Sequence, residues 1–258
     1  MIGRPAWFSE VGTRGSNEDS CAFWWAGDTL FAAIADGLGG MGGGDRASSY
    51  VVGCLKARAT RAAVSASQLA EMIRQGHHGL RQLQQRQAEH RSMATTLTVV
   101  ALRGRTLVAA HCGDTRLYVA GRAGVRQLTE DHSEAQRLLN EGLLSRSGFA
   151  SYPRKHILES ALGIPGVPAV QEIECRVDAG DWLVLASDGA YGKLVHDDLH
   201  DAARASRTPR QFSEACRRLV EARQPRDNYT LVVLRAMSQR VPPVLQRALQ
   251  CRRADGTV

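Results

Sequence analysis

Long apolar runs, paired cysteines and a secretory leader are all missing from this sequence. No stretch reaches the ~18 apolar residues that a membrane-spanning helix needs. Residues 1–5 lack the charged start and apolar run of a signal peptide. The six cysteines are scattered, without a single CxxC spacing. We therefore expect no membrane span, no zinc site and no disulfide framework, but free thiols in a reducing cytoplasm.

Aromatic residues are also scarce, at 5% of the chain. The net charge is +7, and residues 204–253 alone hold twelve arginines against three acidic residues. No aromatic-rich or helix-turn-helix pattern accompanies this charge, so we expect no nucleic-acid partner. Two interpretations of the basic region stay open: a solvated helix face, or a docking surface for an acidic or phosphorylated protein.

Strand and helix patterns follow one another irregularly along the chain. Short apolar or alternating runs predict strands at residues 7–11, 20–25, 29–35, 95–102, 106–111, 116–120, 125–128, 170–177, 182–186 and 229–235. Helical patterns occupy residues 47–63, 67–90, 133–141, 197–205 and 210–222, and residues 142–155 are expected to be an irregular, mobile surface segment. This order differs from the strict alternation of a parallel doubly wound sheet. It favours helices packed outside stacked antiparallel sheets, an α+β fold.

Four aspartates lie where an apolar run ends or is about to begin. Asp36 and Asp188 precede a glycine, Asp227 precedes an asparagine, and Asp114 follows a glycine. A carboxylate at a strand end is held rigidly, and an adjacent glycine lets the backbone approach a ligand. Mg²⁺ and Mn²⁺ prefer such oxygen ligands. A single Asp-Gly pair usually marks a turn, but four such sites in one chain favour a divalent-cation centre.

Six short motifs succeed one another along the chain. They read Arg14-Gly15-Ser16-Asn17-Glu18-Asp19-Ser20, Ala35-Asp36-Gly37-Leu38-Gly39-Gly40, Ala94-Thr95-Thr96, Gly113-Asp114-Thr115-Arg116, Ser187-Asp188-Gly189 and Asp227-Asn228-Tyr229-Thr230. In this order they resemble the motifs of the PP2C-type (PPM) metal-dependent protein phosphatases, over residues 9–234. Each motif is weak alone, but the ordered set is specific. The first two look like the bacterial branch, whose usual counterpart is a Ser/Thr kinase.

The resemblance implies an αββα sandwich of two central antiparallel β-sheets flanked by helices. It also implies two Mn²⁺ or Mg²⁺ ions in a cleft at one end of the sandwich. By position in the motifs, Asp36 would bridge the two ions. The Gly37 carbonyl would bind one ion, which Glu18 would serve directly or through water. Asp188 and Asp227 would bind the other ion.

The predicted chemistry is hydrolysis of a phosphate ester. A water that bridges two cations loses a proton near neutral pH, and the resulting hydroxide can attack phosphorus in line with the seryl oxygen. By its place in the motif, Arg14 would hold the substrate phosphate and neutralise its charge. We therefore predict a protein serine/threonine phosphatase whose partners are phosphorylated proteins, the substrates of a Ser/Thr kinase. Two other classes stay open: a phosphoprotein-binding pseudophosphatase, against which the complete aspartate set argues, and a metal-dependent nuclease, which only the basic C-terminal region favours.

The chain departs from the family pattern at three positions. Bacterial relatives usually carry a histidine where this chain has Met41, and eukaryotic relatives carry a proposed general-acid histidine where it has Leu38. The group that protonates the leaving alkoxide therefore stays open. Gly192 stands where relatives have a carboxylate for a third ion, which leaves Asp114 and Asp188 to hold it. Because fewer carboxylates bind a hard cation more weakly, we expect two tight ions and at most a weak third one at Asp114.

Several residues near the motifs are given structural roles. Thr95 and Thr96 are expected to pack in a sheet, His111 and His132 to be satisfied structural histidines, and Asp19 to cap a turn.

The chain is expected to divide into a phosphatase domain at residues 1–237 and a basic tail at residues 238–258. The tail is expected to be either a short helix at residues 244–251 or disordered. Asp197 and Asp198 are expected to start a helix, where acidic residues favour the helix dipole, and not to bind an ion.

Overall fold

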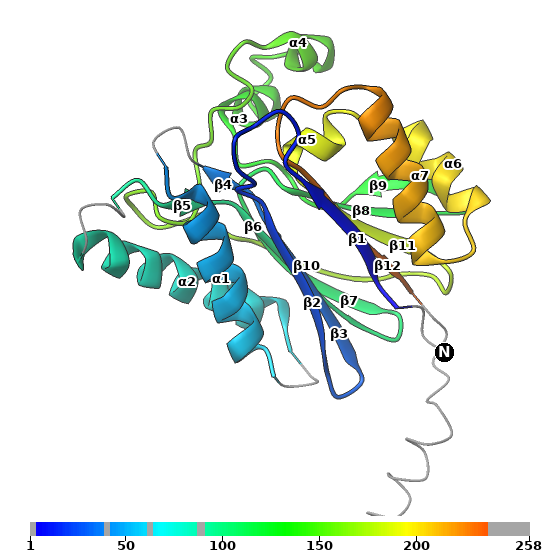
Figure 1. The fold of residues 1–258 in the computed structure, drawn as a ribbon, viewed down its shortest axis with the longest axis horizontal. Helices are drawn as coiled ribbons and strands as arrows, with labels where there is room; N and C mark the ends of the chain where they lie inside the picture. The colour runs from blue at the N-terminus through cyan, green and yellow to red at the C-terminus, as the bar shows by residue number, and fades with distance from the viewer. Residues whose placement is uncertain (1–3, 39–41, 61–63, 87–90, 237–258) are drawn as a thin grey trace, which may run out of the picture.

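Two five-stranded antiparallel sheets lie face to face in the computed structural model of the chain, which describes residues 4–38, 42–60, 64–86 and 91–236 (Figure 1). The first, sheet A, has the order β1 (Ala6–Glu10), β12 (Tyr229–Arg235), β11 (Trp182–Ala186), β8 (Arg116–Gly121) and β9 (Gly124–Gln127). The second, sheet B, has the order β10 (Gln171–Arg176), β7 (Thr106–Cys112), β6 (Leu97–Arg103), β3 (Thr29–Ala35) and β2 (Ser20–Ala26). Strands β1 and β12, the first and last within the described residues, pair with Trp7 opposite Val232.

Helices cover the outer face of each sheet. The pair α1 (Gly44–Arg58) and α2 (Ala66–Arg86) packs on sheet B, and the pair α6 (His196–Ala205) and α7 (Pro209–Ala222) packs on sheet A (Figure 1). Local sequence explains where α7 begins: the Thr208 hydroxyl accepts the Gln211 N–H at 3.2 Å, and Pro209 occupies the first turn. The predicted αββα sandwich is confirmed.

Three apolar layers result from this stacking. One lies between α1, α2 and sheet B, one between the two sheets, and one between sheet A and α6, α7. Central strands contribute to two layers at once, so every residue of β3 and of β11 is buried. This explains why both segments are continuous apolar runs and do not alternate.

Shorter elements at one end of the sandwich were not predicted. They are β4 (Gly37–Leu38), which pairs with β5 (Ala94–Thr95), and the single-turn helix α5 (Asp188–Tyr191). The predicted strand at residues 95–102 is in fact β5 followed by β6, with Thr96 between them.

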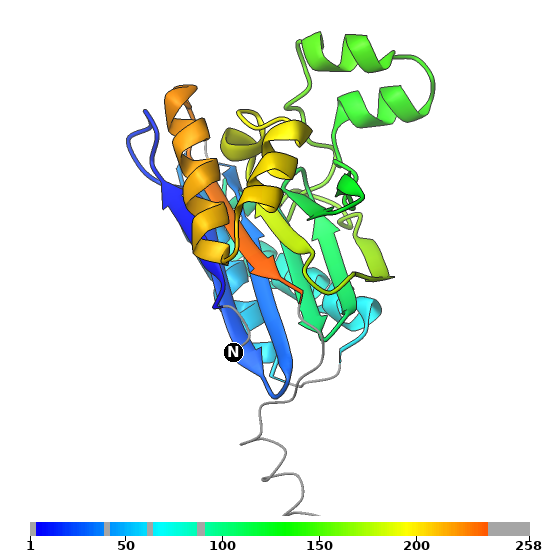
Figure 2. The same ribbon diagram turned by 90° about the vertical axis from the view of Figure 1, so that its right-hand side faces the viewer.

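The segment predicted to be irregular, residues 142–155, was wrong in part. It contains the helix α4 (Arg146–Ser151), which follows α3 (Glu134–Asn140) at the same end of the molecule (Figure 2). The Ser145 hydroxyl accepts the Gly148 N–H at 3.0 Å and so caps the first turn of α4. A cap of this kind is easily missed in a polar run that lacks apolar periodicity.

Helix boundaries shift from their predicted positions at α1 and α2. Helix α1 begins three residues earlier than predicted. The predicted ends of the two helices, at residues 61–63 and 87–90, lie outside the described residues. Met41 and the tail lie outside them as well. Among the residues that the structure describes, every helix is too short or too polar to traverse a lipid bilayer.

Candidate active site

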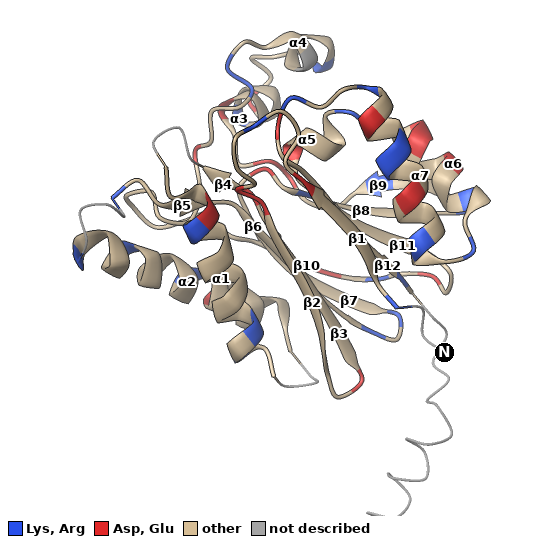
Figure 3. Cartoon of the chain, in the orientation of Figure 1, with Lys and Arg blue, Asp and Glu red and all other residues tan. Residues whose placement is uncertain are grey.

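A cleft of about 610 Å³ opens at the end of the sandwich where β3, β7 and β11 terminate. Its lining comes from six separate stretches of the chain: Arg14, Gly15, Ser16, Glu18, Asp36, Gly37, Leu38, Asp114, His156, Leu158, Asp188, Asp227 and Asn228. All seven residues predicted for the site lie around this one cleft. Acidic segments (red in Figure 3) gather at the same end of the central strands, near β4 and α5.

Asp36 is held by its own backbone at the point where β3 leaves sheet B. Its N–H donates to the Thr96 hydroxyl at 2.9 Å, and its carbonyl accepts the Thr96 N–H and the Thr95 hydroxyl, both at 2.9 Å. Both threonines are fully buried. The prediction that they serve only sheet packing was therefore incomplete, because their hydroxyls fix the backbone of the central carboxylate.

Gly37 lies where three segments converge. Its N–H donates to the Glu18 carbonyl at 3.1 Å. A Cβ atom on this residue would lie 2.4 Å from the Gly44 carbonyl and 2.6 Å from the Glu18 carbonyl oxygen. No side chain fits in this space, so glycine is required for α1 and the Glu18 loop to approach the end of β3.

Asp188 and Asp227 are brought together by the junction of α5 with the segment before β12. A Cβ atom on Gly189 would lie 2.0 Å from the Asn228 carbonyl oxygen, which shows how closely the two backbones approach. Asp188 is the first residue of α5, and the preceding strand, β11, ends at Ala186. The carboxylate therefore projects from a helix N-terminus, where the helix dipole favours negative charge.

Asn228 holds the Arg14–Glu18 loop against the start of β12 through side-chain hydrogen bonds. Its side-chain amide donates to the carbonyls of Val11 at 2.8 Å and Ser16 at 2.9 Å, and its side-chain oxygen accepts the Glu18 N–H at 2.8 Å. In the sequence Asn228 stands out only as part of a motif. Its three bonds span more than 200 residues of chain, so nothing local could have revealed this role.

Arg14 reaches over the cleft from this loop. Its guanidinium donates to the Asp227 carboxylate at 2.7 Å, and 60% of its side chain is exposed. The hydrogen bond to Asp227 raises the pKa of Arg14 above its usual value. A cation that engaged Asp227 would compete with this ion pair and leave the guanidinium directed at the cleft.

Asp19 is a buried carboxylate that sequence reasoning assigned only to a turn. One of its oxygens accepts the Ser187 hydroxyl at 2.7 Å, and Ser187 in turn accepts the Thr230 N–H at 2.9 Å. Its other oxygen, Oδ1, is buried and has no partner within the described residues. Burial raises the pKa of Asp19 to about 6. It links the Glu18 loop to the strand ends that carry Asp188 and Asp227.

Asp114 lines the cleft from the turn between β7 and β8. Its neighbour Gly113 donates its N–H to the His132 ring at 3.2 Å and accepts the His132 N–H at 2.7 Å. The second histidine, His111, is fully buried and hydrogen-bonds to the Thr98 hydroxyl at 2.8 Å. His132 thus supports the turn, but the prediction that both histidines are satisfied was wrong for His111, whose Nε2 is buried without a partner within the described residues.

No further carboxylate approaches Asp114 from α6. Asp197 and Asp198 lie in the first turn of that helix, as predicted. Asp198 accepts the Val195 N–H at 2.8 Å and pairs with Arg223, which occupies both of its oxygens. Gly192, at the end of α5, contributes no side chain.

Three carboxyl groups of the cleft, those of Asp36, Asp114 and Asp188, resist ionisation in the absence of cations. Burial, followed by the charges of Asp19 and Asp188, raises the pKa of Asp36 well above its usual range. Burial raises the pKa of Asp188, which also shares a hydrogen bond with Asp36, and burial raises the pKa of Asp114 to about 8. When the pKa of a buried carboxyl group is raised in this way, an opposite charge at close range stabilises its ionised form.

Divalent cations fit this donor set. Within the described residues, no three carboxylate, imidazole or thiol groups lie as close together as the ligands of a single closed metal cage. A ring of carboxylates around an open cleft instead suits Mg²⁺ or Mn²⁺, which keep several waters and take one or two carboxylates each. The unpartnered Asp19 oxygen and the raised carboxyl pKa values indicate that this group of carboxylates suits positively charged ions.

The segment after α4 supplies a residue that sequence reasoning did not assign. His156 lines the cleft, its side chain is 67% exposed, and its Nδ1 lies 4.0 Å from Asp188 Oδ2. Leu38, which stands where a histidine was expected from eukaryotic relatives, also lines the cleft.

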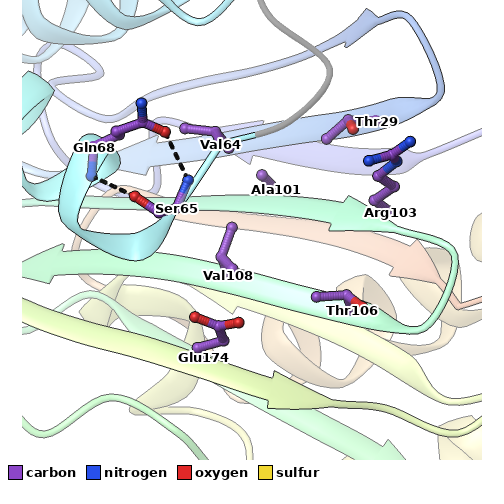
Figure 4. A pocket seen from close by; sticks show the side chains of 9 residues that line it. All are labelled: Thr29, Val64, Ser65, Gln68, Ala101, Arg103, Thr106, Val108 and Glu174. Carbon is purple, nitrogen blue, oxygen red and sulfur yellow. Dashed lines mark hydrogen bonds between the residues drawn. The ribbon is translucent and has the colours of Figure 1, made fainter.

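A second hollow, of about 360 Å³, lies on the outer face of sheet B beside the start of α2 (Figure 4). Its lining includes Arg103 and Glu174 over the apolar floor of Ala101 and Val108. At its edge Ser65 and Gln68 exchange hydrogen bonds of 2.9 and 3.2 Å, a capping box that starts α2. Among the residues described in this hollow, Glu174 is the only carboxylate, so the set of five carboxylates in the large cleft has no counterpart here.

Comparison with known proteins gives consistent matches. The family model for Protein phosphatase 2C matches residues 11–227. The serine/threonine phosphatase stp of Listeria monocytogenes is 29% identical over 214 residues, which cover 80% of this chain and 85% of that protein. The serine/threonine protein phosphatase PstP of Mycobacterium tuberculosis is 30% identical over 227 residues, which cover 85% of this chain and 42% of that protein. A solved structure, the catalytic domain of PstP in complex with two manganese ions, has a TM-score of 0.78 at 25% identity and covers 92% of this chain and 99% of that one.

Proposed function

The chain belongs to the Protein phosphatase 2C family, and from this premise we propose that it removes phosphate from phosphoserine and phosphothreonine in proteins. It is a phosphoprotein phosphatase. One observation carries the proposal: a chain that matches the family over residues 11–227 gathers five carboxylates and an arginine around a single cleft. The similar proteins stp and PstP are both named serine/threonine phosphatases.

The proposed ion-binding residues are those that line the cleft. Asp36 would bridge two divalent cations, with the Gly37 carbonyl on one and Asp188 and Asp227 on the other. Glu18 would serve the first ion, directly or through water. This is supported by the raised carboxyl pKa values of Asp36 and Asp188 and by the two manganese ions bound to the similar PstP domain. Mn²⁺ and Mg²⁺ both suit this oxygen donor set, and when bound they would activate water and neutralise phosphate charge.

The chain's own residues have separate roles in this proposal. Arg14 would bind the phosphate of the substrate, since its guanidinium is exposed beside the cleft and can form two parallel hydrogen bonds with a phosphate. Thr95 and Thr96 would keep Asp36 in position through its backbone. Asp114 would provide at most a weak third ion site, because α6 and Gly192 add no carboxylate to it.

The biological setting is proposed from the same basis. Substrates would be phosphoproteins produced by a Ser/Thr kinase. A reducing cytoplasm fits the five described cysteines, which are all free thiols. The alternative of a phosphoprotein-binding pseudophosphatase is less well supported, because a binder would not need the full carboxylate set.

The test is hydrolysis of p-nitrophenyl phosphate and of a phosphothreonine peptide by the full-length chain, with Mn²⁺ and with a chelator. We expect Mn²⁺-dependent turnover that Asp36→Asn and Asp188→Asn each reduce by about 10²- to 10³-fold, the loss typical of removing a charge-stabilising group. Asp28→Asn is the matched control, because Asp28 pairs with Arg103 in the turn after β2, away from the cleft.

Retention of more than roughly a tenth of wild-type activity by either cleft variant would contradict the assignment of the ion-binding residues. Tight binding of the phosphopeptide without any turnover would favour the pseudophosphatase.

A further inference from the structure

A strip of aromatic side chains is exposed along the open margin of the sandwich. Trp7 on β1 is 54% exposed and Trp25 on β2 is 45% exposed. Phe23, two residues before Trp25 on β2, has its ring centroid 5.2 Å from that of Trp7. We call Trp7, Phe23 and Trp25 the aromatic strip. Both strands are at the edges of their sheets, and they lie side by side (Figure 2).

Strand alternation explains why these side chains share one face. Phe8 packs toward α6 and α7, so its neighbour Trp7 points to the space between the sheets. Phe23 packs against the apolar layer in that space, and Trp25, two residues further, faces the same side. The strip is therefore the uncovered edge of the layer between the sheets.

The other two tryptophans of the chain are fixed in a different way. The Trp24 indole N–H donates to the Ala59 carbonyl at 2.9 Å, and the Trp182 indole N–H donates to the Ala203 carbonyl at 3.2 Å. Within the described residues, the indole N–H groups of Trp7 and Trp25 make no hydrogen bond. Large, half-exposed aromatic rings of this kind mark interaction surfaces more often than empty surface.

The chain itself supplies a segment that starts beside the strip. Strand β12 is the neighbour of β1, and its path is fixed up to Ala236, whose N–H donates to the Asp181 carbonyl at 2.8 Å. Trp7 lies opposite Val232, four residues before Ala236, which is about 14 Å along the strand. Pro242 is six residues further along the chain than Ala236, a length that can span up to about 20 Å. A segment that turned back from Ala236 would therefore be long enough to reach Trp7.

The sequence of this segment matches an aromatic surface. Residues 241–245 read Val-Pro-Pro-Val-Leu. Consecutive prolines favour the extended polyproline II conformation, which has little entropy to lose on binding, and aromatic-lined surfaces recognise it. We propose that residues 241–245 dock in cis on the aromatic strip, with Pro242 and Pro243 against Trp7 and Trp25. None of the three residues of the strip lines the catalytic cleft, so this inference does not depend on the proposed function.

The indole N–H signals of the four tryptophans test the docking directly. In ¹⁵N-labelled full-length chain, each indole gives one NMR signal, assigned with single Trp→Phe variants. We expect the double variant Pro242→Ser/Pro243→Ser to shift the signals of Trp7 and Trp25 and to leave those of Trp24 and Trp182 unchanged, because the latter two are held by hydrogen bonds elsewhere. The matched control Val167→Ser changes an apolar residue that is 89% exposed outside the strip, and it should shift neither Trp7 nor Trp25.

A second measurement keeps the proposal open to refutation if the double variant folds poorly. A photo-crosslinking amino acid in place of Val244 in the full-length chain should form crosslinks to residues 6–26 within one molecule. Unshifted Trp7 and Trp25 signals would overturn the proposal, and so would crosslinks no stronger than those from the same amino acid at Val167. Crosslinks found mainly between two chains, together with a dimer by light scattering, would also overturn it and identify a second copy as the occupant.

Discussion

Replacement of Thr96 by valine tests how the central carboxylate is held. Valine has the same shape as threonine but lacks the hydroxyl that accepts the Asp36 N–H at 2.9 Å. Thr96 is fully buried, so the added methyl closes the space against water. The Thr96 N–H bond to the Asp36 carbonyl, also at 2.9 Å, is unaffected because it belongs to the backbone. The substitution therefore removes one hydrogen-bond acceptor from a site that offers no substitute.

An N–H group left without a partner inside a protein costs about 1–3 kcal/mol. For a chain of this size, 1 kcal/mol corresponds to about 2–4 °C in Tm, so we expect Thr96→Val to lower Tm by about 2–12 °C. The backbone of Asp36 is loosened at the same time, and we expect activation to require a higher Mn²⁺ concentration. If Thr96 only packed in the sheet, as the sequence predicted, Thr96→Val would leave both Tm and the Mn²⁺ requirement unchanged.

Thermal unfolding in chelator and Mn²⁺ titration of p-nitrophenyl phosphate hydrolysis measure the two effects separately. Thr96→Ser is the control, because it keeps the hydroxyl and loses only a methyl group, which costs about 1 kcal/mol and leaves the Asp36 contact in place. If Thr96→Val matches the wild type in both Tm and Mn²⁺ requirement while Thr96→Ser is the less stable variant, the hydrogen-bond reasoning is refuted.

Four further outcomes can be checked on the same preparations. Arg14→Ala should raise KM for phosphorylated substrates with a smaller change in kcat, since a contact made with the phosphate in both ground and transition states behaves this way; unchanged KM and unchanged inhibition by free phosphate would exclude Arg14 as the phosphate ligand. Asp114→Ala should cost less activity than Asp36→Asn because the third ion site is weak, and equal losses in steady-state assays would contradict this. Burial raises the pKa of Asp114 from 3.8 to about 8, so the metal-free folded chain holds a proton that the unfolded chain releases. Its stability relative to Asp114→Asn should then fall as pH rises from about 4 to 8, and parallel denaturant curves across this range would disprove it. Removal of residues 238–258 should leave hydrolysis of p-nitrophenyl phosphate intact, because every motif precedes them, and loss of folded protein would show that the fold requires the tail.

Sequence patterns were most informative where a local rule decides the structure. Asp36 follows a continuous apolar run and precedes a glycine, and the structure places it at the end of a buried central strand beside a glycine that has no room for a side chain. The pattern of strands and helices likewise predicted the sandwich, because buried central strands and covering helices have different periodicities.

The rest of the site depends on contacts between distant parts of the chain. Glu18 and Asp19 are adjacent and chemically alike, yet one lines the cleft and the other is buried beneath it. Asp19 accepts a hydrogen bond from the hydroxyl of Ser187, which lies 168 residues further along the chain. The approach of His156 to Asp188 is also a contact between distant parts of the chain, because it depends on how the segment after α4 folds back.

The pairing of β1 with β12 has a consequence for how the protein is made. Arg14 and Glu18 emerge from the ribosome more than 200 residues before their partners Asp227 and Asn228. At synthesis rates of about 5–20 residues per second, the cleft stays incomplete for roughly 10–50 s after the first strand appears. A nascent chain therefore has no phosphatase activity before β12 is made. A polypeptide that stops anywhere before β12 has no assembled cleft, and its unpaired β1 is accessible to proteases.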